Sequence, residues 1–276
     1  MLLGDYNELE VAREVDFGMY LISDDGDILL PAKYIPTGTR VGDTVRVFVY
    51  RDSEDRLIAT NLEPYALVGQ FATLTVRDVS AVGAFLDWGL EKDLLIPHSN
   101  LRRTLRPGDR ATVFVYLDET TDRIVASAKW EWFLSDQPYP GKAGDTAELL
   151  IADETDLGYK AIVDGTHQGL LYHNEVFKPL RLGDVHTGYV RQVRPDGKLD
   201  LTIQRPGYDE ALAAADDLLA ALRKTGSIPL GDKSEPDDIY RRLGMSKKIF
   251  KKALGSLYKQ GLVTLAPLET RLVGEE

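Results

Sequence analysis

The residues best suited to contact a charged ligand are five lysines near the end of the chain. They are Lys247, Lys248, Lys251, Lys252 and Lys259. Their spacing predicts a helix that Ser246 opens as N-cap and that ends before Gly261, with Ile249 and Leu257 on the opposite face. Such a helix either contacts nucleic-acid phosphates or forms a plain solvated surface. The balance of 11 basic and 11 acidic residues over 207–276 favours neither interpretation.

Side chains that would support catalysis or metal binding are sparse. The chain has no cysteine, which excludes disulfides, thiolate metal sites and cysteine nucleophiles. Its histidines, at positions 98, 167, 173 and 186, lack the carboxylate spacing of a metal site. No phosphate-binding glycine loop and no His-Glu-x-x-His motif occurs. We therefore predict a protein that is not an enzyme and that has no cofactor and no metal.

Net charge restricts how this chain can meet a nucleic acid. It carries 33 basic and 44 acidic residues, a net charge of −11. Residues 1–62 contain 6 basic and 12 acidic residues, 63–130 contain 8 and 9, and 131–206 contain 8 and 12. A uniformly basic surface is excluded, so contact with phosphates must be local and is least favourable in the first segment.

Composition and hydropathy predict a soluble globular protein. The chain is 43% hydrophobic and 28% charged, near the averages for such proteins. Its first residues lack the basic-then-apolar order of a secretory signal, and no apolar stretch approaches the ~18 residues of a membrane helix. We expect a cytoplasmic location and no membrane partner.

A threefold repeat organises the first three quarters of the chain. Gly18, Gly83 and Gly158 are followed 24 or 25 residues later by Gly-Asp pairs at Gly42, Gly108 and Gly183, and an aromatic residue comes six positions after each pair's glycine: Phe48, Phe114 and Tyr189. Val45, Val47 and Val49 alternate with other residues, which is the period of a half-buried strand. About five short strands in each ~65-residue repeat predict a small closed barrel.

The last segment has a helical pattern. We predict helices over 209–224 (from Leu212, Ala215, Leu219 and Leu222), 237–243 (opened by a capping box at Ser234) and 247–260, followed by two strands around Pro267. Three helices and a two-stranded wing predict a winged helix. The fold class is thus mainly β with an α C-terminus: barrels over 1–62, 63–140 and 141–206, then a winged helix over 207–276.

Particular motifs of the repeats resemble a known family. Gly83-Ala-Phe-Leu, Leu94-Leu-Ile-Pro-His and the Gly-Asp pair at Gly108 look like an S1-type RNA-binding domain, an OB-fold barrel; repeats one and three are degenerate but in frame. Three such barrels followed by a winged helix are similar, over essentially the whole chain, to the conserved virulence factor B (YitL-like) family. That resemblance implies RNA binding and post-transcriptional regulation, including regulation of virulence-factor expression in pathogens.

The S1-type pattern implies a set of ligand-binding residues in repeat two. These are Phe85, His98, Asp118 and Arg123, with Arg102, Arg103, Arg106 and Arg110 as nearby positive charge. Val82 holds the place of the usual first aromatic residue, and Trp88 is expected to substitute for it. OB barrels stack bases on such rings. The alternative is that Phe85 and Trp88 are core residues and that the arginines form a solvated loop.

The other two repeats match the pattern less completely. Repeat one supplies Phe17, Tyr20, Asp52 and Arg56, with Ala32 in place of the histidine and Lys33 beside it. Repeat three supplies Tyr159, Lys160, Tyr172, His173, Arg191, Arg194 and Lys198, with Lys160 in place of the phenylalanine. Barrel one is equally consistent with packing or protein contact, and His173 with a loop residue bonded to backbone.

The combined prediction is a protein that binds single-stranded RNA mainly on barrel two, helped by barrel three and the winged helix. It would be a post-transcriptional regulator. One alternative is a scaffold whose acidic barrel one docks a basic ribosomal or transcription protein. Another is a DNA-binding regulator acting through the winged helix, although duplex DNA is not the expected partner.

Overall fold

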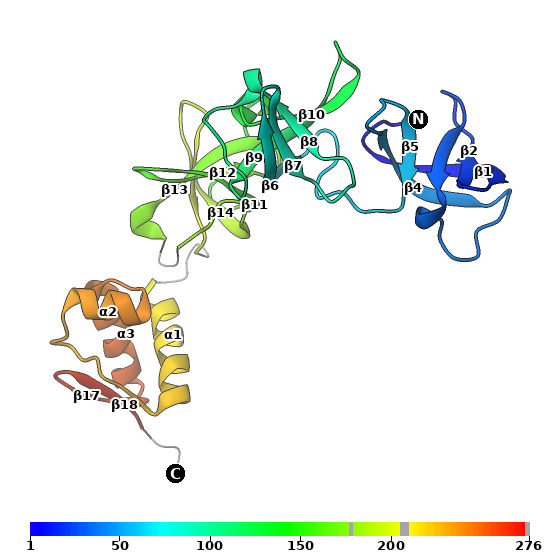
Figure 1. Ribbon diagram of the computed structural model, residues 1–276. Helices are drawn as coiled ribbons and strands as arrows, with labels where there is room; N and C mark the ends of the chain where they lie inside the picture. The colour runs from blue at the N-terminus through cyan, green and yellow to red at the C-terminus, as the bar shows by residue number, and fades with distance from the viewer. Residues whose placement is uncertain (177–178, 205–209, 274–276) are drawn as a thin grey trace.

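Three closed β-barrels and a winged helix follow one another along the chain. The computed structural model describes residues 1–176, 179–204 and 210–273 (Figure 1). In each barrel the strands are ordered first, second, third, fifth and fourth, and the first and fourth strands pair to close it. The predicted fold class, mainly β with an α C-terminus, is confirmed.

The strands of the barrels have the following bounds. Barrel 1 contains β1 (Tyr6–Val15), β2 (Gly18–Leu21), β3 (Ile28–Pro31), β4 (Thr44–Arg51) and β5 (Leu57–Thr60). Barrel 2 contains β6 (Phe71–Ser80), β7 (Gly83–Asp87), β8 (Leu94–Pro97), β9 (Arg110–Asp118) and β10 (Arg123–Ser127). Barrel 3 contains β11 (Thr146–Thr155), β12 (Gly158–Val163), β13 (His167–Tyr172), β14 (Val185–Val193) and β15 (Leu199–Thr202). Short 3-10 helices are η1 (Ala32–Tyr34), η2 (His98–Asn100), η3 (Trp130–Phe133) and η4 (His173–Glu175).

Glycine is needed at the two repeated positions for different reasons. Gly83 begins β7 with a φ of +150°, and a Cβ there would overlap with the carbonyl oxygen of Ile96 in β8. Only glycine lets the two strands approach so closely. Gly108, with a φ of +89°, forms the turn before β9, and the Asp109 carboxylate accepts the backbone N–H of Arg106 at 2.9 Å. This turn recurs at Asp43 and Asp184.

The repeated aromatic residue joins one barrel to the next element. Val47 and Val49 of β4 point into barrel 1, whereas the Phe48 ring between them points outward yet is fully buried. Its centroid lies 5.8 Å from that of Trp88 in barrel 2. Phe114 of barrel 2 stacks on Phe133 of η3, with centroids 4.4 Å apart. In the first two repeats this aromatic position therefore marks a packing contact outside its own barrel rather than a solvated strand face.

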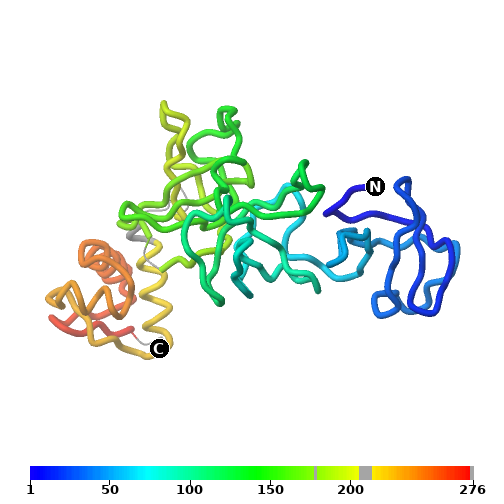
Figure 2. Tube along the Cα trace, turned by 45° about the horizontal axis from the view of Figure 1, so that its top comes forward, coloured from blue at the N-terminus to red at the C-terminus, as the bar shows by residue number. Residues whose placement is uncertain are grey.

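Barrels 2 and 3 share a buried cluster centred on Trp130 of η3. The Trp130 side chain is 1% exposed and packs with Ala152 and Ile162 of barrel 3 and with Phe71 and Phe114 of barrel 2. In Figures 1 and 2 these two barrels lie side by side, with barrel 1 and the winged helix at opposite ends.

The C-terminal unit has the topology of a winged helix. It contains α1 (Glu210–Thr225), β16 (Ser227–Ile228), α2 (Pro236–Leu243), α3 (Lys247–Lys259), β17 (Val263–Ala266) and β18 (Glu269–Leu272). Strand β16 pairs with β18, so the sheet has a third strand that two residues were too few to predict. Leu218, Leu222, Phe250, Leu254 and Leu257 form its core.

Two predicted helix starts can be compared with the structure, and one is wrong. Ser246 caps α3 as predicted, because its hydroxyl accepts the Ile249 N–H at 3.3 Å. Helix α2 begins instead after Glu235, with Pro236 in its first turn. The buried Ser234 hydroxyl accepts the N–H of Gly231 at 2.9 Å and so shapes the preceding loop. Asp209 and the Leu212 side chain of the first predicted helix lie outside the described residues.

Candidate nucleic-acid interface

Strands β7, β8 and β10 form the face of barrel 2 on which the sequence predicts stacking. Phe85 of β7 pairs in register with Leu95 of β8, which pairs in turn with Val125 of β10. The Phe85 ring is half-buried. His98 is exposed, and its backbone N–H donates to the carbonyl of the exposed Val82 at 3.0 Å. Phe85 thus lies in the middle of β7, and it is Gly83, two residues earlier, that pairs with Pro97 just before η2.

A hollow of about 460 Å³ lies against this face. From barrel 2 it is lined by Val82, Phe85, Trp88, Lys92, Leu95 and Arg123; from barrel 1 it is lined by Tyr50, Arg51, Ser53 and Asp55. The half-buried Phe85 ring, three cations (Arg51, Lys92 and Arg123) and two carboxylates (Asp55 and Asp93) therefore line one space. His98 is not among the residues that line it.

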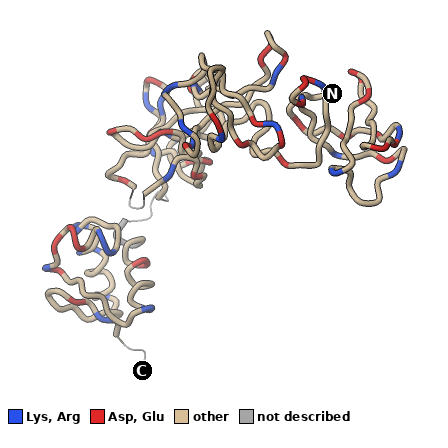
Figure 3. Tube along the Cα trace, viewed as in Figure 1, with Lys and Arg blue, Asp and Glu red and all other residues tan. Residues whose placement is uncertain are grey.

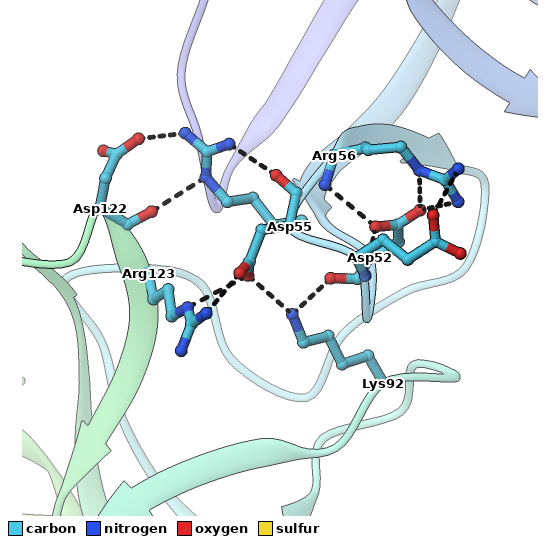
Figure 4. A network of polar contacts seen from close by, with 8 residues as sticks. Asp52, Asp55, Arg56, Lys92, Asp122 and Arg123 are labelled. Carbon is cyan, nitrogen blue, oxygen red and sulfur yellow. Dashed lines mark hydrogen bonds and ion pairs between the residues drawn. The ribbon is translucent and has the colours of Figure 1, made fainter.

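The cations of this hollow are held by the acidic β4–β5 turn of barrel 1 (Figure 4). Arg123 Nε donates to Asp55 Oδ1 at 3.1 Å, and its Nη2 pairs with the same carboxylate. Lys92 Nζ donates to the Asp52 carbonyl at 2.6 Å and lies 3.8 Å from Asp55 Oδ1. The hydrogen bond from Arg123 is the main cause that lowers the pKa of Asp55 below its ordinary value. Burial lowers the pKa of Lys92. A phosphate reaching Arg123 must compete with Asp55.

A reciprocal ion pair runs the other way across the same junction. Arg51 of barrel 1 donates through Nε to the carbonyl of Asp122 in barrel 2 at 3.0 Å, and its Nη2 pairs with the Asp122 carboxylate. The tips of two β-hairpins, 52–55 and 119–122, are thereby held together. Sequence gives no signal for these contacts, because their partners are about 70 positions apart.

Trp88 does not provide the second stacking ring that the sequence suggests. Its side chain is 3% exposed, its Nε1–H donates to the Lys92 carbonyl at 2.6 Å, and its ring meets Phe48 edge to face. Trp88 belongs to the apolar contact between barrels 1 and 2. The expectation of an exposed platform at this position is therefore corrected, since barrel 1 covers the ring.

Asp118 has a local structural role. Its carboxylate accepts the Thr120 N–H at 3.0 Å and the Thr121 hydroxyl at 2.8 Å, and the Thr121 bond is the main cause that lowers its pKa. It thereby shapes the β9–β10 turn that presents Arg123.

Some of the arginines before and in β9 form ion pairs and others do not. Arg102 Nη1 lies 2.9 Å from Glu131 and 3.5 Å from Asp153 of barrel 3. Arg103 and Arg110 are exposed and form no ion pair with any residue that the structure describes. All three arginines line a groove of about 210 Å³ beside Trp130, between barrels 2 and 3. That groove offers free positive charge.

Barrel 1 keeps an exposed phenylalanine beside a partly exposed tyrosine, but the cations predicted to bind there are paired. Phe17 is 58% exposed and lies edge to face with Tyr20, over which Arg13 stacks at 4.1 Å. Arg13 is paired with Asp27. The other predicted ion-binding side chains are also paired: Arg56 with Asp52, and Lys33 with Glu91 of barrel 2.

Barrel 3 does not present its predicted residues as a stacking surface. Tyr159 is 8% exposed and packs edge to face against His173, whose Nε2 is 2.8 Å from the Thr155 carbonyl. Lys160 Nζ lies 3.5 Å from Glu131, so its charge is paired at the junction with barrel 2. The other predicted cations are paired within the barrel: Arg191 with Glu175, Arg194 with Asp200 and Lys198 with Asp196. The expectation for Tyr159 and Lys160 is therefore corrected.

Tyr159 and His173 instead line a larger hollow that also includes the winged helix. Its volume is about 640 Å³, and Tyr240, Arg241 and Met245 line its other side. Arg241 is paired with Asp238 on its own helix.

The lysines of α3 lie together on its solvent side. Phe250, Ala253, Leu254 and Leu257 face the core, whereas Lys248, Lys251, Lys252 and Lys259 are exposed and Lys247 is partly exposed. Within the described parts of the chain, none of the five forms an ion pair. Elsewhere acidic and basic residues are interspersed (Figure 3). Helix α3 therefore carries the densest run of unpaired cations in the described chain.

Two protein families match the chain. The S1 domain family matches residues 3–62 and 68–129, and the CvfB-like winged helix domain family matches residues 216–272. A Bacillus subtilis protein named YitL is 32% identical over 273 residues, covering 94% of this chain and 90% of that protein. The chain belongs to the conserved virulence factor B (YitL-like) family.

Other members of the conserved virulence factor B family are more distant. The Staphylococcus epidermidis protein is 26% identical and covers 94% of this chain and 82% of its own. The protein of Staphylococcus aureus strain N315 is 23% identical, covering 82% and 78%. A solved Streptococcus pneumoniae structure, described as a multidomain protein with nucleic acid binding domains, is 26% identical over 98% of both chains, with a TM-score of 0.47.

The two family matches show which types of domain this member of the conserved virulence factor B family contains. S1 and winged-helix domains are nucleic-acid-binding domains, and neither is an enzyme family. In the described residues no three histidine or acidic side chains gather as metal ligands, and no described helix is long and apolar enough to cross a membrane.

Proposed function

We propose that this protein binds single-stranded RNA without catalysing a reaction on it and acts as a post-transcriptional regulator in the cytoplasm. The observation that carries the proposal is the hollow on barrel 2, where the Phe85 ring shares one space with Arg123 and Lys92. Membership of a family with S1 domains supports a nucleic acid as the ligand. Stacking on Phe85 supplies contact with any base, and the cations supply contact with phosphate.

The remaining modules would extend the path of the RNA. Arg103 and Arg110 leave free positive charge between barrels 2 and 3, and the α3 lysines leave more at the end of the chain. Weak contacts on linked modules add through effective concentration, so none needs high affinity alone. With a net charge of −11, the protein would repel the strand elsewhere.

Replacing both Phe85 and His98 with alanine tests barrel 2 as the main platform. We expect RNA affinity to fall by about 1 kcal/mol or more, roughly fivefold, because stacking contributes ~1–3 kcal/mol per base. The measurement is fluorescence anisotropy of a labelled 12-nucleotide oligouridylate at fixed salt. Phe17→Ala is the comparison, since it removes an exposed ring from barrel 1. A loss below fivefold in the double variant, or a larger loss with Phe17→Ala, would remove barrel 2 from this role.

The pairing of Asp55 with Arg123 predicts a substitution that raises RNA affinity instead of lowering it. Asp55→Asn removes the carboxylate that competes with phosphate, so we expect RNA affinity to rise about 1.5- to fivefold, the scale of one exposed ion pair. Glu54→Gln is the matched control: it removes the same charge from the same turn, but among the described residues Glu54 forms an ion pair with Arg56 and with no cation of the hollow. Equal effects of the two variants in the same anisotropy assay would attribute the gain to net charge alone.

The scaffold alternative loses part of its basis in the structure. Its acidic surface on barrel 1 includes Asp52 and Asp55, and both are engaged by cations within the chain. The duplex-DNA alternative rests on α3.

A further inference from the structure

One indole lies far outside any core. Trp132 is 72% exposed, more than any other large hydrophobic side chain that the structure describes. It belongs to η3, the short helix after barrel 2, whose other aromatic residues face inward. Trp130 is buried between barrels 2 and 3, and Phe133 stacks on Phe114. Because both neighbours are anchored, the chain holds Trp132 outward on a fixed support.

A cation accompanies the ring. Lys129 Nζ lies 4.7 Å from the centroid of the Trp132 ring, a distance typical of cation–π contact. The backbone N–H of Trp132 donates to the backbone carbonyl of Lys129 at 3.1 Å, which holds the two residues in one turn. Within the described residues Lys129 forms no ion pair. The ammonium over one face of the indole thus has no anionic partner among the described residues.

The carboxylate within η3 is already paired, since Glu131 lies 2.9 Å from Arg102 and 3.5 Å from Lys160. Asp136, three residues after η3, is exposed and has no ion-pair partner among the described residues. Ala128 and Trp130, which flank Lys129, line the groove that holds the unpaired Arg103 and Arg110. The cations around Trp132 therefore favour an anionic ligand.

We propose that Trp132 and Lys129 form a stacking site for one unpaired base and its phosphate, separate from the Phe85 face of barrel 2. The indole stacks on the base, and the ammonium contacts the adjoining phosphate. The site lies at the junction of barrels 2 and 3, where a strand leaving barrel 2 would pass Arg103 and Arg110. The proposal rests on the proposed function, since the ligand is the same single-stranded RNA.

The protein's own tryptophans provide a direct test. Trp88 and Trp130 are 3% and 1% exposed, so acrylamide quenching of the full-length protein reports mainly Trp132. We expect a saturating 12-nucleotide oligouridylate to reduce quenching by acrylamide in the wild type. In Trp132→Leu the quenching by acrylamide should be weak, and RNA should not reduce it further. Affinity by anisotropy should fall about fivefold or more in Trp132→Leu and less in Trp132→Phe, which keeps a ring.

A matched oligomer separates stacking from charge. A 12-mer of abasic deoxynucleotides keeps the phosphates but has no bases, so Trp132→Leu should leave its binding unchanged relative to wild type. Lys129→Gln should weaken binding of both the abasic oligomer and the oligouridylate.

The outcomes distinguish this proposal from the function on which it rests. Normal oligouridylate binding with Trp132 still open to acrylamide, and with Trp132→Leu within twofold of wild type, would overturn the stacking site alone. No binding of oligouridylate by the wild type would overturn both. Shielding of Trp132 that grows with protein concentration in the absence of RNA would identify self-association and would also overturn the site.

Discussion

Replacing Trp130 with alanine is expected to lower the free energy of unfolding of barrels 2 and 3 by about 3–5 kcal/mol, the usual cost of truncating a buried tryptophan. The ring is 1% exposed and lies between Ala152 and Ile162 on one side and Phe71 and Phe114 on the other. Removing it leaves a cavity at the junction of two barrels, where neither barrel can collapse to fill the space without moving the other.

Calorimetry can test this effect on the full chain. Because barrels 2 and 3 share the Trp130 cluster, we expect them to unfold in one transition in the wild type. In Trp130→Ala that transition should shift down and separate into two, since each barrel keeps its own core but loses the common one.

Trp132→Ala is the matched control for this prediction. It removes the same side chain two positions away, but from a site that is 72% exposed, so the expected change in stability is within about 0.5 kcal/mol. Equal destabilisation by both substitutions would mean that η3 as a whole, rather than the Trp130 cluster, joins the two barrels.

The sequence predicts the barrels well because each requirement of the barrel is local. Strand alternation in β4 and the turn at Gly108 depend on residues within a few positions of one another. The spacing between Gly83 and Gly108 recurs in all three repeats for the same reason. The two-residue alternation of a strand and the residues of a tight turn both lie within one short segment. Such features can therefore be predicted from that segment alone.

The burial of Phe48 and Trp88 could not be predicted in the same way. A period of two places Phe48 on the outer face of barrel 1, where it would be exposed in an isolated barrel. The packing of barrel 2 against that face buries it. Whether an outward ring is a stacking platform or part of an interface depends on the neighbouring module, which the repeat pattern does not specify.

The ion pairs that the predicted cations form could not be predicted from the sequence either. Arg123 fits the S1-type pattern and Lys160 replaces its phenylalanine, and both were expected to bind the ligand, but Asp55 and Glu131 engage them from other modules. The start of α2, in contrast, could have been predicted from a local signal. Proline is typical of the first helical position, so Pro236 selects Glu235 rather than Ser234 as the N-cap.

Replacing Lys248, Lys251 and Lys252 together with glutamine is expected to weaken RNA binding by up to about 100-fold at 0.1 M salt. Each phosphate contact with a single strand contributes a slope of about 0.7 in the dependence of log affinity on log salt. Three contacts contribute about 2.1, which corresponds to roughly 100-fold between 0.1 M and 1 M salt. These lysines are exposed on one side of α3 and have no ion-pair partner among the described residues, so glutamine should leave the fold intact.

A second triple variant removes the same charge elsewhere in the winged helix. Arg223, Lys224 and Lys233 are exposed and lie outside α3, so their replacement with glutamine should change the salt slope little. Equal losses in the two triple variants would reduce the effect to net charge, and no loss in either would make α3 a solvated face. Titrating a duplex of the same length in parallel decides the remaining alternative. If α3 reads duplex DNA, the duplex should bind more tightly than the single strand, and the α3 variant should abolish that preference while leaving oligouridylate bound by barrel 2.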